Sequence, residues 1–159
     1  MKRLLIGIAV AGAACLPLSS GVEAAATAAA YEVPMEFVRI ENRWRPGEYI
    51  HVEHGLAFGR IQHGWHSAQW AIERTEDGYF RIANRWRDTE YLHVENGRLE
   101  SGPILPGWHS AMWVMEPAEE GYVRLRNRWR ADQYIHVERG RLQAGRIQPG
   151  WHSAMWRVR

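Results

Sequence analysis

Four side chains that could together hold a small polar ligand recur three times along the chain. In the first occurrence they are His51 and Glu53, separated by one residue, and Trp65 followed directly by His66. An indole offers a flat face to the apolar side of a sugar ring, while histidine and carboxylate groups hydrogen-bond its hydroxyls. The combination therefore predicts a shallow carbohydrate-binding site. The candidate residues are His51, Glu53, Trp65, His66, His93, Glu95, Trp108, His109, His136, Glu138, Trp151 and His152.

The same residues could in principle serve a metal ion or a catalytic reaction, and the pattern favours neither. Metal ligands must converge within about 2 Å of one point, and the sequence has no His-x-x-x-His motif and a single cysteine, Cys15. A glycosidase needs two carboxyl groups at a set separation around one bond. Three similar shallow sites favour binding over chemistry in one deep cleft. We therefore expect no metal, no cofactor and no enzymatic activity.

The tryptophans show how regular the recurrence is. All nine fall at three equivalent positions, 42 or 43 residues apart: Trp44, Trp86 and Trp129; Trp65, Trp108 and Trp151; Trp70, Trp113 and Trp156. The last set lies between apolar neighbours and is predicted to be core. The middle set lies in Gly-Trp-His-Ser loops and is either a stacking platform or a lid on the core. The first set lies in Asn-Arg-Trp-Arg turns, where the neighbouring arginines could stack on the ring. We favour a structural role for it, and a second binding surface is the alternative.

These positions belong to three copies of one segment, at residues 37–78, 79–121 and 122–159. Each copy alternates apolar and polar residues over short stretches, as in Tyr49–Glu53, and indicates four short strands with no helix. Asn96-Gly97 suits a tight hairpin turn after the second strand. Twelve strands in three copies are too few for a propeller. The predicted fold is therefore an all-β β-trefoil, in which the first and fourth strands form a barrel and the hairpins cap it.

At this point the chain resembles the ricin B-type lectin family of β-trefoils over Phe37 to Arg159. Its Tyr-Ile-His-Val-Glu-x-Gly hairpin resembles the family's Cys-Leu-Asp-Val-x-x-Gly, and its Ser-Ala-x-Trp resembles the Gln-x-Trp signature. The resemblance implies a sugar pocket in each copy, with His51, His93 and His136 in place of the pocket aspartate. It implies an aromatic platform at Trp65, Trp108 and Trp151, and places Ser67, Ser110 and Ser153 near the pocket asparagine. The missing aspartate, glutamine and disulfide argue against a galactose-type specificity.

The first 24 residues have the pattern of a secretory signal peptide: Lys2 and Arg3, an apolar run and small residues ending at Ala24. The apolar run is too short to span a membrane and remain as an anchor. Lipidation of Cys15 is the alternative. Cleavage after Ala24 would remove Cys15 and leave no disulfide, with residues 25–36 as a linker and 37–159 as the domain. We expect a secreted or periplasmic monomer.

The formal net charge of +2 is too small for a basic nucleic-acid-binding surface. The sequence as a whole therefore predicts a carbohydrate-binding, lectin-like module with up to three equivalent sites, whose partner is a glycan or polysaccharide. The alternative is a protein-interaction β-trefoil, such as an inhibitor or a cell-envelope binding partner.

Overall fold

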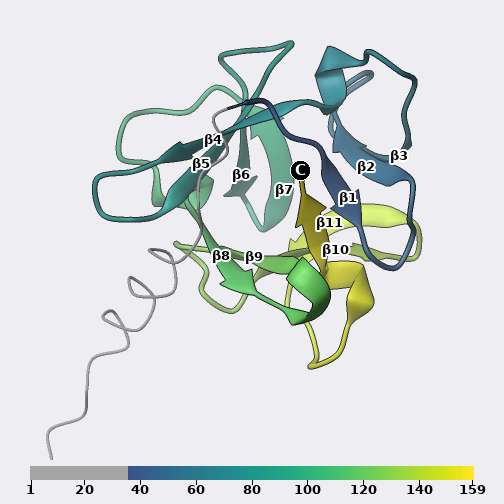
Figure 1. Ribbon diagram of the computed structural model, residues 1–159. Helices are drawn as coiled ribbons and strands as arrows, with labels where there is room; N and C mark the ends of the chain where they lie inside the picture. The colour runs from purple at the N-terminus through teal and green to yellow at the C-terminus, as the bar shows by residue number, and fades with distance from the viewer. Residues whose placement is uncertain (1–35) are drawn as a thin grey trace, which may run out of the picture.

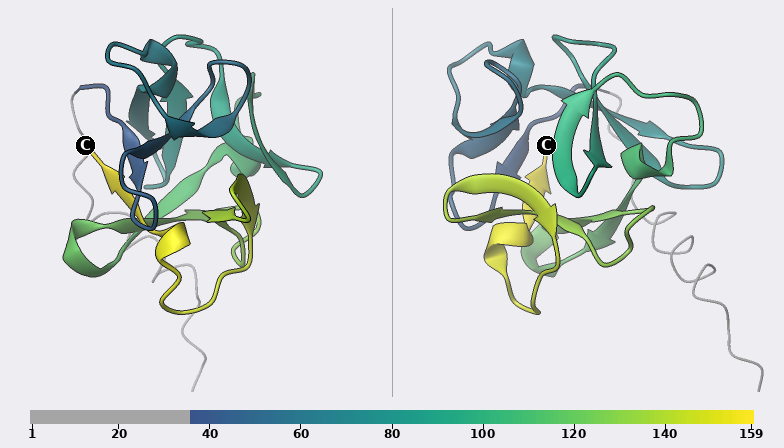
Figure 2. Two further views of the ribbon diagram at one scale, coloured as in Figure 1. Left: turned by 90° about the vertical axis from the view of Figure 1, so that its right-hand side faces the viewer. Right: turned by 180° about the vertical axis from the view of Figure 1, so that it is seen from behind.

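The computed structural model of the protein describes residues 36–159. The predicted signal peptide and all but the last residue of the predicted linker lie outside the described residues. The described chain forms twelve strands arranged as three lobes around a common centre, which Figure 1 and Figure 2 show from three directions. None of its helices is long and apolar enough to cross a membrane.

Each of the three copies contributes four strands and one short 3-10 helix. Copy one has β1 (Ile40–Asn42), β2 (Glu48–His51), β3 (Ala57–Arg60), η1 (His66–Ala68) and β4 (Trp70–Arg74). Copy two has β5 (Phe80–Asn84), β6 (Tyr91–Glu95), β7 (Arg98–Gly102), η2 (His109–Ala111), β8 (Trp113–Pro117) and an additional turn, η3 (Glu119–Gly121). Copy three has β9 (Val123–Asn127), β10 (Tyr134–Glu138), β11 (Arg141–Gly145), η4 (His152–Ala154) and β12 (Trp156–Val158).

The first and fourth strands of the copies form a closed barrel, as predicted. The fourth strand of one copy pairs antiparallel with the first strand of the next in β4–β5, β8–β9 and β12–β1. Within each copy the ring is completed by single pairs, Val38 with Trp70, Phe80 with Trp113 and Val123 with Trp156. The hairpins β2–β3, β6–β7 and β10–β11 extend from this barrel. The chain is a β-trefoil.

The core contains one tryptophan from each fourth strand, which confirms the prediction for this set. Trp70, Trp113 and Trp156 are completely buried. Each indole N–H donates to a backbone carbonyl of the second strand in its own copy, at 2.8–3.0 Å. The large apolar ring is therefore buried without leaving its polar atom unpaired, and it fixes the hairpin to the barrel.

The hairpin turns follow the sequence in two copies and differ in the third. Asn96-Gly97 has φ values of 48° and 76°, and Arg139-Gly140 has 50° and 74°, as a type I′ turn requires. In copy one, which is one residue shorter, β2 already ends at His51 and only Gly55 of the equivalent pair has a positive φ. The fourth strand of copy two begins at Trp113, because the short helix η2 ends only at Ala111.

A candidate ligand site between neighbouring repeats

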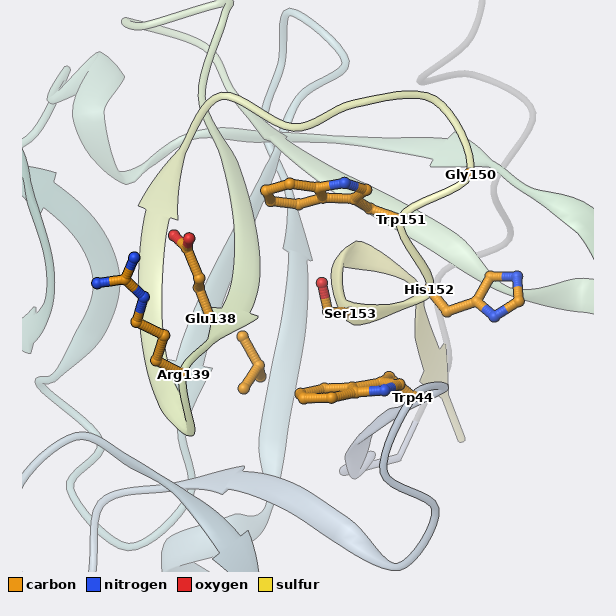
Figure 3. Close-up of a pocket in the computed structure, with 8 residues that line it drawn as sticks. Trp44, Glu138, Arg139, Gly150, Trp151, His152 and Ser153 are labelled. Atoms are coloured by element: carbon orange, nitrogen blue, oxygen red, sulfur yellow. The ribbon is translucent and has the colours of Figure 1, made fainter.

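Two tryptophans from different copies face each other across a cleft of about 390 Å³. Trp151 precedes η4 in copy three, and Trp44 lies in the turn after β1 of copy one. Figure 3 shows both rings nearly edge-on, one above the other, with their faces turned toward the gap. Ser153 lies between them and Glu138, at the end of β10, lies to one side. The cleft thus has two apolar walls and polar groups at its sides.

An equivalent cleft of about 450 Å³ lies between copies two and three. Trp108 forms one wall and Trp129 the other, and the polar residues of the lining are Glu95, Asn96, His109 and Ser110. In both clefts the wall from the Asn-Arg-Trp-Arg turn belongs to the copy that follows around the barrel, because β12 pairs with β1 and β8 with β9. The site therefore lies at the boundary between copies, which we call the seam.

A buried asparagine holds the two walls of each seam together. Asn127 is fully buried, and its side-chain amide donates to the Ser110 carbonyl at 2.8 Å. Its side-chain oxygen accepts from the backbone N–H groups of Trp129 and Arg130, both at 3.0 Å. One side chain thus shapes the turn that carries Trp129 and ties that turn to the loop that carries Trp108. Asn42 and Asn84 make the equivalent bonds, to the carbonyls of Ser153 and Ser67, both at 3.0 Å.

The arginines of the same turns stack on aromatic rings, as the sequence suggested. Arg130 lies over Trp129 at 4.7 Å from the ring centre, and it does not line the cleft. The arginine that precedes each turn tryptophan reaches instead to the aromatic residue at the start of the preceding copy, as Arg128 does over Tyr79 at 4.2 Å. Trp129 is still 53% exposed. The stacking agrees with the favoured structural role, and the exposed ring leaves the alternative of a second binding surface as a prediction.

The histidines of the second strands lie behind the platform tryptophans. His93 and His136 are 3% and 2% exposed, and each meets the ring of Trp108 or Trp151 edge-on, with centroids 5.9 and 5.7 Å apart. Their Nδ1 atoms lie 3.0–3.1 Å from backbone carbonyls of their own strands. Neither lines its cleft. The alternation correctly placed them opposite the core residues, but they support the platform instead of facing the ligand space.

Glycines opposite these histidines make the close packing possible. A β-carbon at Gly145 would lie 3.0 Å from Cε1 of His136, and one at Gly102 would lie 3.4 Å from Cε1 of His93. In copy one the ring of His51 is half-buried and meets Trp65 edge-on at 5.6 Å. Burial lowers the pKa of His51 below its ordinary value, opposed by the nearby Glu53 carboxylate. All three histidines thus occupy the space behind a platform ring.

The histidines that follow the platform tryptophans are exposed. His66, His109 and His152 begin the short helices η1, η2 and η4. His109 and His152 contribute to the cleft linings. In Figure 3 the ring of His152 is directed away from the gap between the two indoles. Of the predicted polar residues, Glu95 and Glu138 and these two histidines therefore line the clefts.

The seam between copies one and two differs from the other two. The carboxylate of Glu53 accepts a hydrogen bond from the hydroxyl of Ser67 at 2.5 Å, and Ser67 is 2% exposed. Glu95 and Glu138, in contrast, are exposed beside their clefts. The residues at the positions of the two wall tryptophans are Trp65 and Trp86 here, of which Trp86 is 51% exposed. The polar groups of this seam are thus already paired with each other.

One copy also brings three potential metal ligands together. Ligand atoms of His93, Glu95 and Glu100 lie within 4.8 Å of one another. The residue at the position of Glu100 is Gln143 in copy three and Ala57 in copy one, as the strand registers show. In copy three the Gln143 amide lies 3.1 Å from Nε2 of His136 and donates to Glu138 at 2.8 Å. This cluster is therefore not a repeated feature, unlike the tryptophan clefts.

Comparison with known proteins finds the same fold in many solved structures. The chain is 30% identical to part of a GlcNAcα1-4Gal-releasing endo-β-galactosidase from Clostridium perfringens, with a TM-score of 0.70 over 78% of this chain and 32% of that one. The chain thus spans about a third of that enzyme's length. No protein-family model and no curated protein sequence matches the chain.

Two smaller proteins are similar over almost their whole length. The designed threefold-symmetric protein ThreeFoil is 19% identical, with a TM-score of 0.66 over 77% of this chain and 96% of that one. SeviL, in its complex with the asialo-GM1 saccharide, is also 19% identical, with a TM-score of 0.65 over 79% and 98%. These matches support the β-trefoil assignment.

Proposed function

We propose that the protein is an exported carbohydrate-binding module of the lectin type, without enzymatic activity, whose glycan sites are the clefts at the seams. Each site takes its platform tryptophan, glutamate and serine from one copy and its second tryptophan from the next. In this proposal the ricin B-type resemblance extends to the fold and to the platform position, and the second wall comes from the cleft geometry of this chain.

The observation that carries the proposal is the pair of facing indoles with a carboxylate beside them. Sugar rings combine apolar C–H faces with hydroxyls at the ring edge, and the cleft offers apolar walls with hydrogen-bonding groups at its sides. Glu138 is the one carboxylate among the residues that line the Trp44–Trp151 cleft. Because glycoside hydrolysis ordinarily uses two carboxyl groups around the scissile bond, this lining is suited to binding.

The neighbours support a glycan ligand in general terms. The clostridial relative is an endo-β-galactosidase, and SeviL was solved with a bound saccharide. Repetition also agrees with a repeated ligand, since several weak sites on one chain strengthen attachment to a polysaccharide by avidity. A single protein partner would not require the same residues at successive seams.

A glycan array probed with the purified protein tests the proposal. The double variant Trp44→Ala/Trp129→Ala removes one exposed wall from each cleft and leaves the half-buried walls, Trp151 and Trp108, in place. We expect binding by the native protein and much weaker binding by the variant, which keeps one wall of each cleft, with unchanged circular dichroism. Leu105→Ala is the matched control, because this exposed apolar side chain lines neither cleft. Full glycan binding by a folded double variant, or no binding by the native protein, would contradict the proposal.

A further inference from the structure

The two-walled shape of the clefts restricts which sugars fit. A site with a single aromatic platform needs only one apolar face on the ligand, and the ligand's other face can remain in water. In the Trp44–Trp151 cleft both walls are indole faces, as Figure 3 shows. A ring held between them must present apolar surface on both sides, because a hydroxyl directed at an indole face loses its hydrogen bonds to water without replacement.

Pyranose stereochemistry decides which rings meet that condition. In a β-glucopyranoside every substituent is equatorial, so both faces of the ring carry only C–H groups and all hydroxyls radiate from the edge. An axial hydroxyl at C4, as in galactose, or at C2, as in mannose, projects from one face. The polar groups Ser153, Glu138 and Arg139 lie at the sides of the gap and not on its walls, and the ring of His152 is directed away from the gap. The groups at the sides are therefore placed for equatorial hydroxyls.

Resting on the proposed function, we infer that the seam clefts select gluco-configured pyranoses, such as β-linked glucose or N-acetylglucosamine residues, over their galacto and manno epimers. The second wall is the specificity determinant. It is Trp44 in one cleft and Trp129 in the other, and both rings are about half exposed, at 52% and 53%. The position of this wall is fixed by the seam asparagines, Asn42 and Asn127.

Matched pairs of epimers test the inference with the purified protein. Methyl β-glucopyranoside is titrated against its C4 and C2 epimers, and cellobiose against β1-4-linked galactobiose, in which both rings have an axial C4 substituent, with tryptophan fluorescence and NMR line shifts as readouts. We expect the gluco-configured member of each pair to bind about tenfold or more tightly, a difference of about 1.4 kcal/mol. In Trp44→Ala/Trp129→Ala the difference between epimers should disappear, because only one wall remains.

The possible outcomes separate this inference from the proposed function. Equal or tighter binding of the galacto or manno epimers would overturn the inference and leave carbohydrate binding in place. Failure of every monosaccharide and disaccharide to bind would overturn both. Choline serves as a further probe, because two indoles beside a carboxylate also attract a quaternary ammonium group. Choline binding without sugar binding would assign the clefts to a cationic ligand instead.

Discussion

The seam asparagines offer the sharpest test of how the site is built, and Asn127→Asp is the most informative change. Asp has the same shape and keeps an oxygen that can accept from the backbone N–H groups of Trp129 and Arg130. It loses the amide that donates to the Ser110 carbonyl at 2.8 Å. The substitution therefore breaks the bond between the two walls and leaves the turn itself intact.

The expected cost follows from burial. Asn127 is 0% exposed, so water cannot replace the missing donor. The lost hydrogen bond is worth about 1 kcal/mol, and a buried carbonyl left facing a carboxylate adds about 1–3 kcal/mol. We expect the free energy of unfolding to fall by about 2–4 kcal/mol, measured by urea denaturation. The deficit should shrink in acid, because a protonated carboxyl group can again donate to the Ser110 carbonyl.

Asn96→Asp provides the control for the unfolding measurement. It makes the same chemical change at an exposed hairpin position with a φ of 48°, which Asp tolerates. We expect it to change the free energy of unfolding by about 0.5 kcal/mol or less. If Asn127→Asp were equally mild, or if its deficit did not depend on pH, the amide would not be the link between the walls. The cleft would then not be held in shape by Asn127.

Further predictions concern the core, pH, stoichiometry and export. Trp113→Ala should lower the free energy of unfolding by about 3–5 kcal/mol. Trp129→Ala removes an exposed ring and should lower it by about 1 kcal/mol or less. Similar losses in thermal unfolding would contradict the division between core and wall tryptophans. Because burial lowers the pKa of His51, its contribution to stability should be complete above pH about 6.5 and be lost as the pH falls through the folded-state pKa, and His51→Gln should flatten this part of the stability profile. Calorimetric titration with a monovalent sugar should give two similar sites and a weaker third, since Ser67 is buried and bonded to Glu53, whereas Ser110 and Ser153 line open clefts; three equal sites would show that the Ser67–Glu53 bond opens freely. Mass spectrometry of protein from its native host should find a mature N-terminus near Ala25, and an intact Met1 would refute export by cleavage.

The sequence predicts the fold well because strands, core positions and turns are specified by residues that are neighbours in the chain. The alternation around Trp113 marks it as core, and Asn96-Gly97 specifies its turn, without knowledge of any distant residue. The position of His93 shows where this reasoning ends. The alternation correctly places it opposite Leu92 and Val94, but a period of two cannot say that Trp108 covers that second face.

The site itself depends on contacts that no single copy contains. Asn42 donates to the carbonyl of Ser153, 111 residues away in the chain. Sequence reasoning therefore treated the Trp44 turn and the Trp151 loop as separate candidates, although they are opposite walls of one cleft. The invariance of Asn-Arg-Trp-Arg in all three copies was the available signal, because a turn conserved only for its own shape has no need of an exposed tryptophan.

Closure of the barrel gives one of the two clefts an additional property. The Trp44–Trp151 cleft lies beside the pairing of β12 with β1, where the last strand of the domain meets the first. A sugar bound there would contact both the first and the last repeat of the domain and would stabilise the pairing between β12 and β1. Occupancy should therefore suppress fraying of the terminal strands, whereas a ligand in the Trp108–Trp129 cleft joins only two segments that are already continuous through β8 and β9.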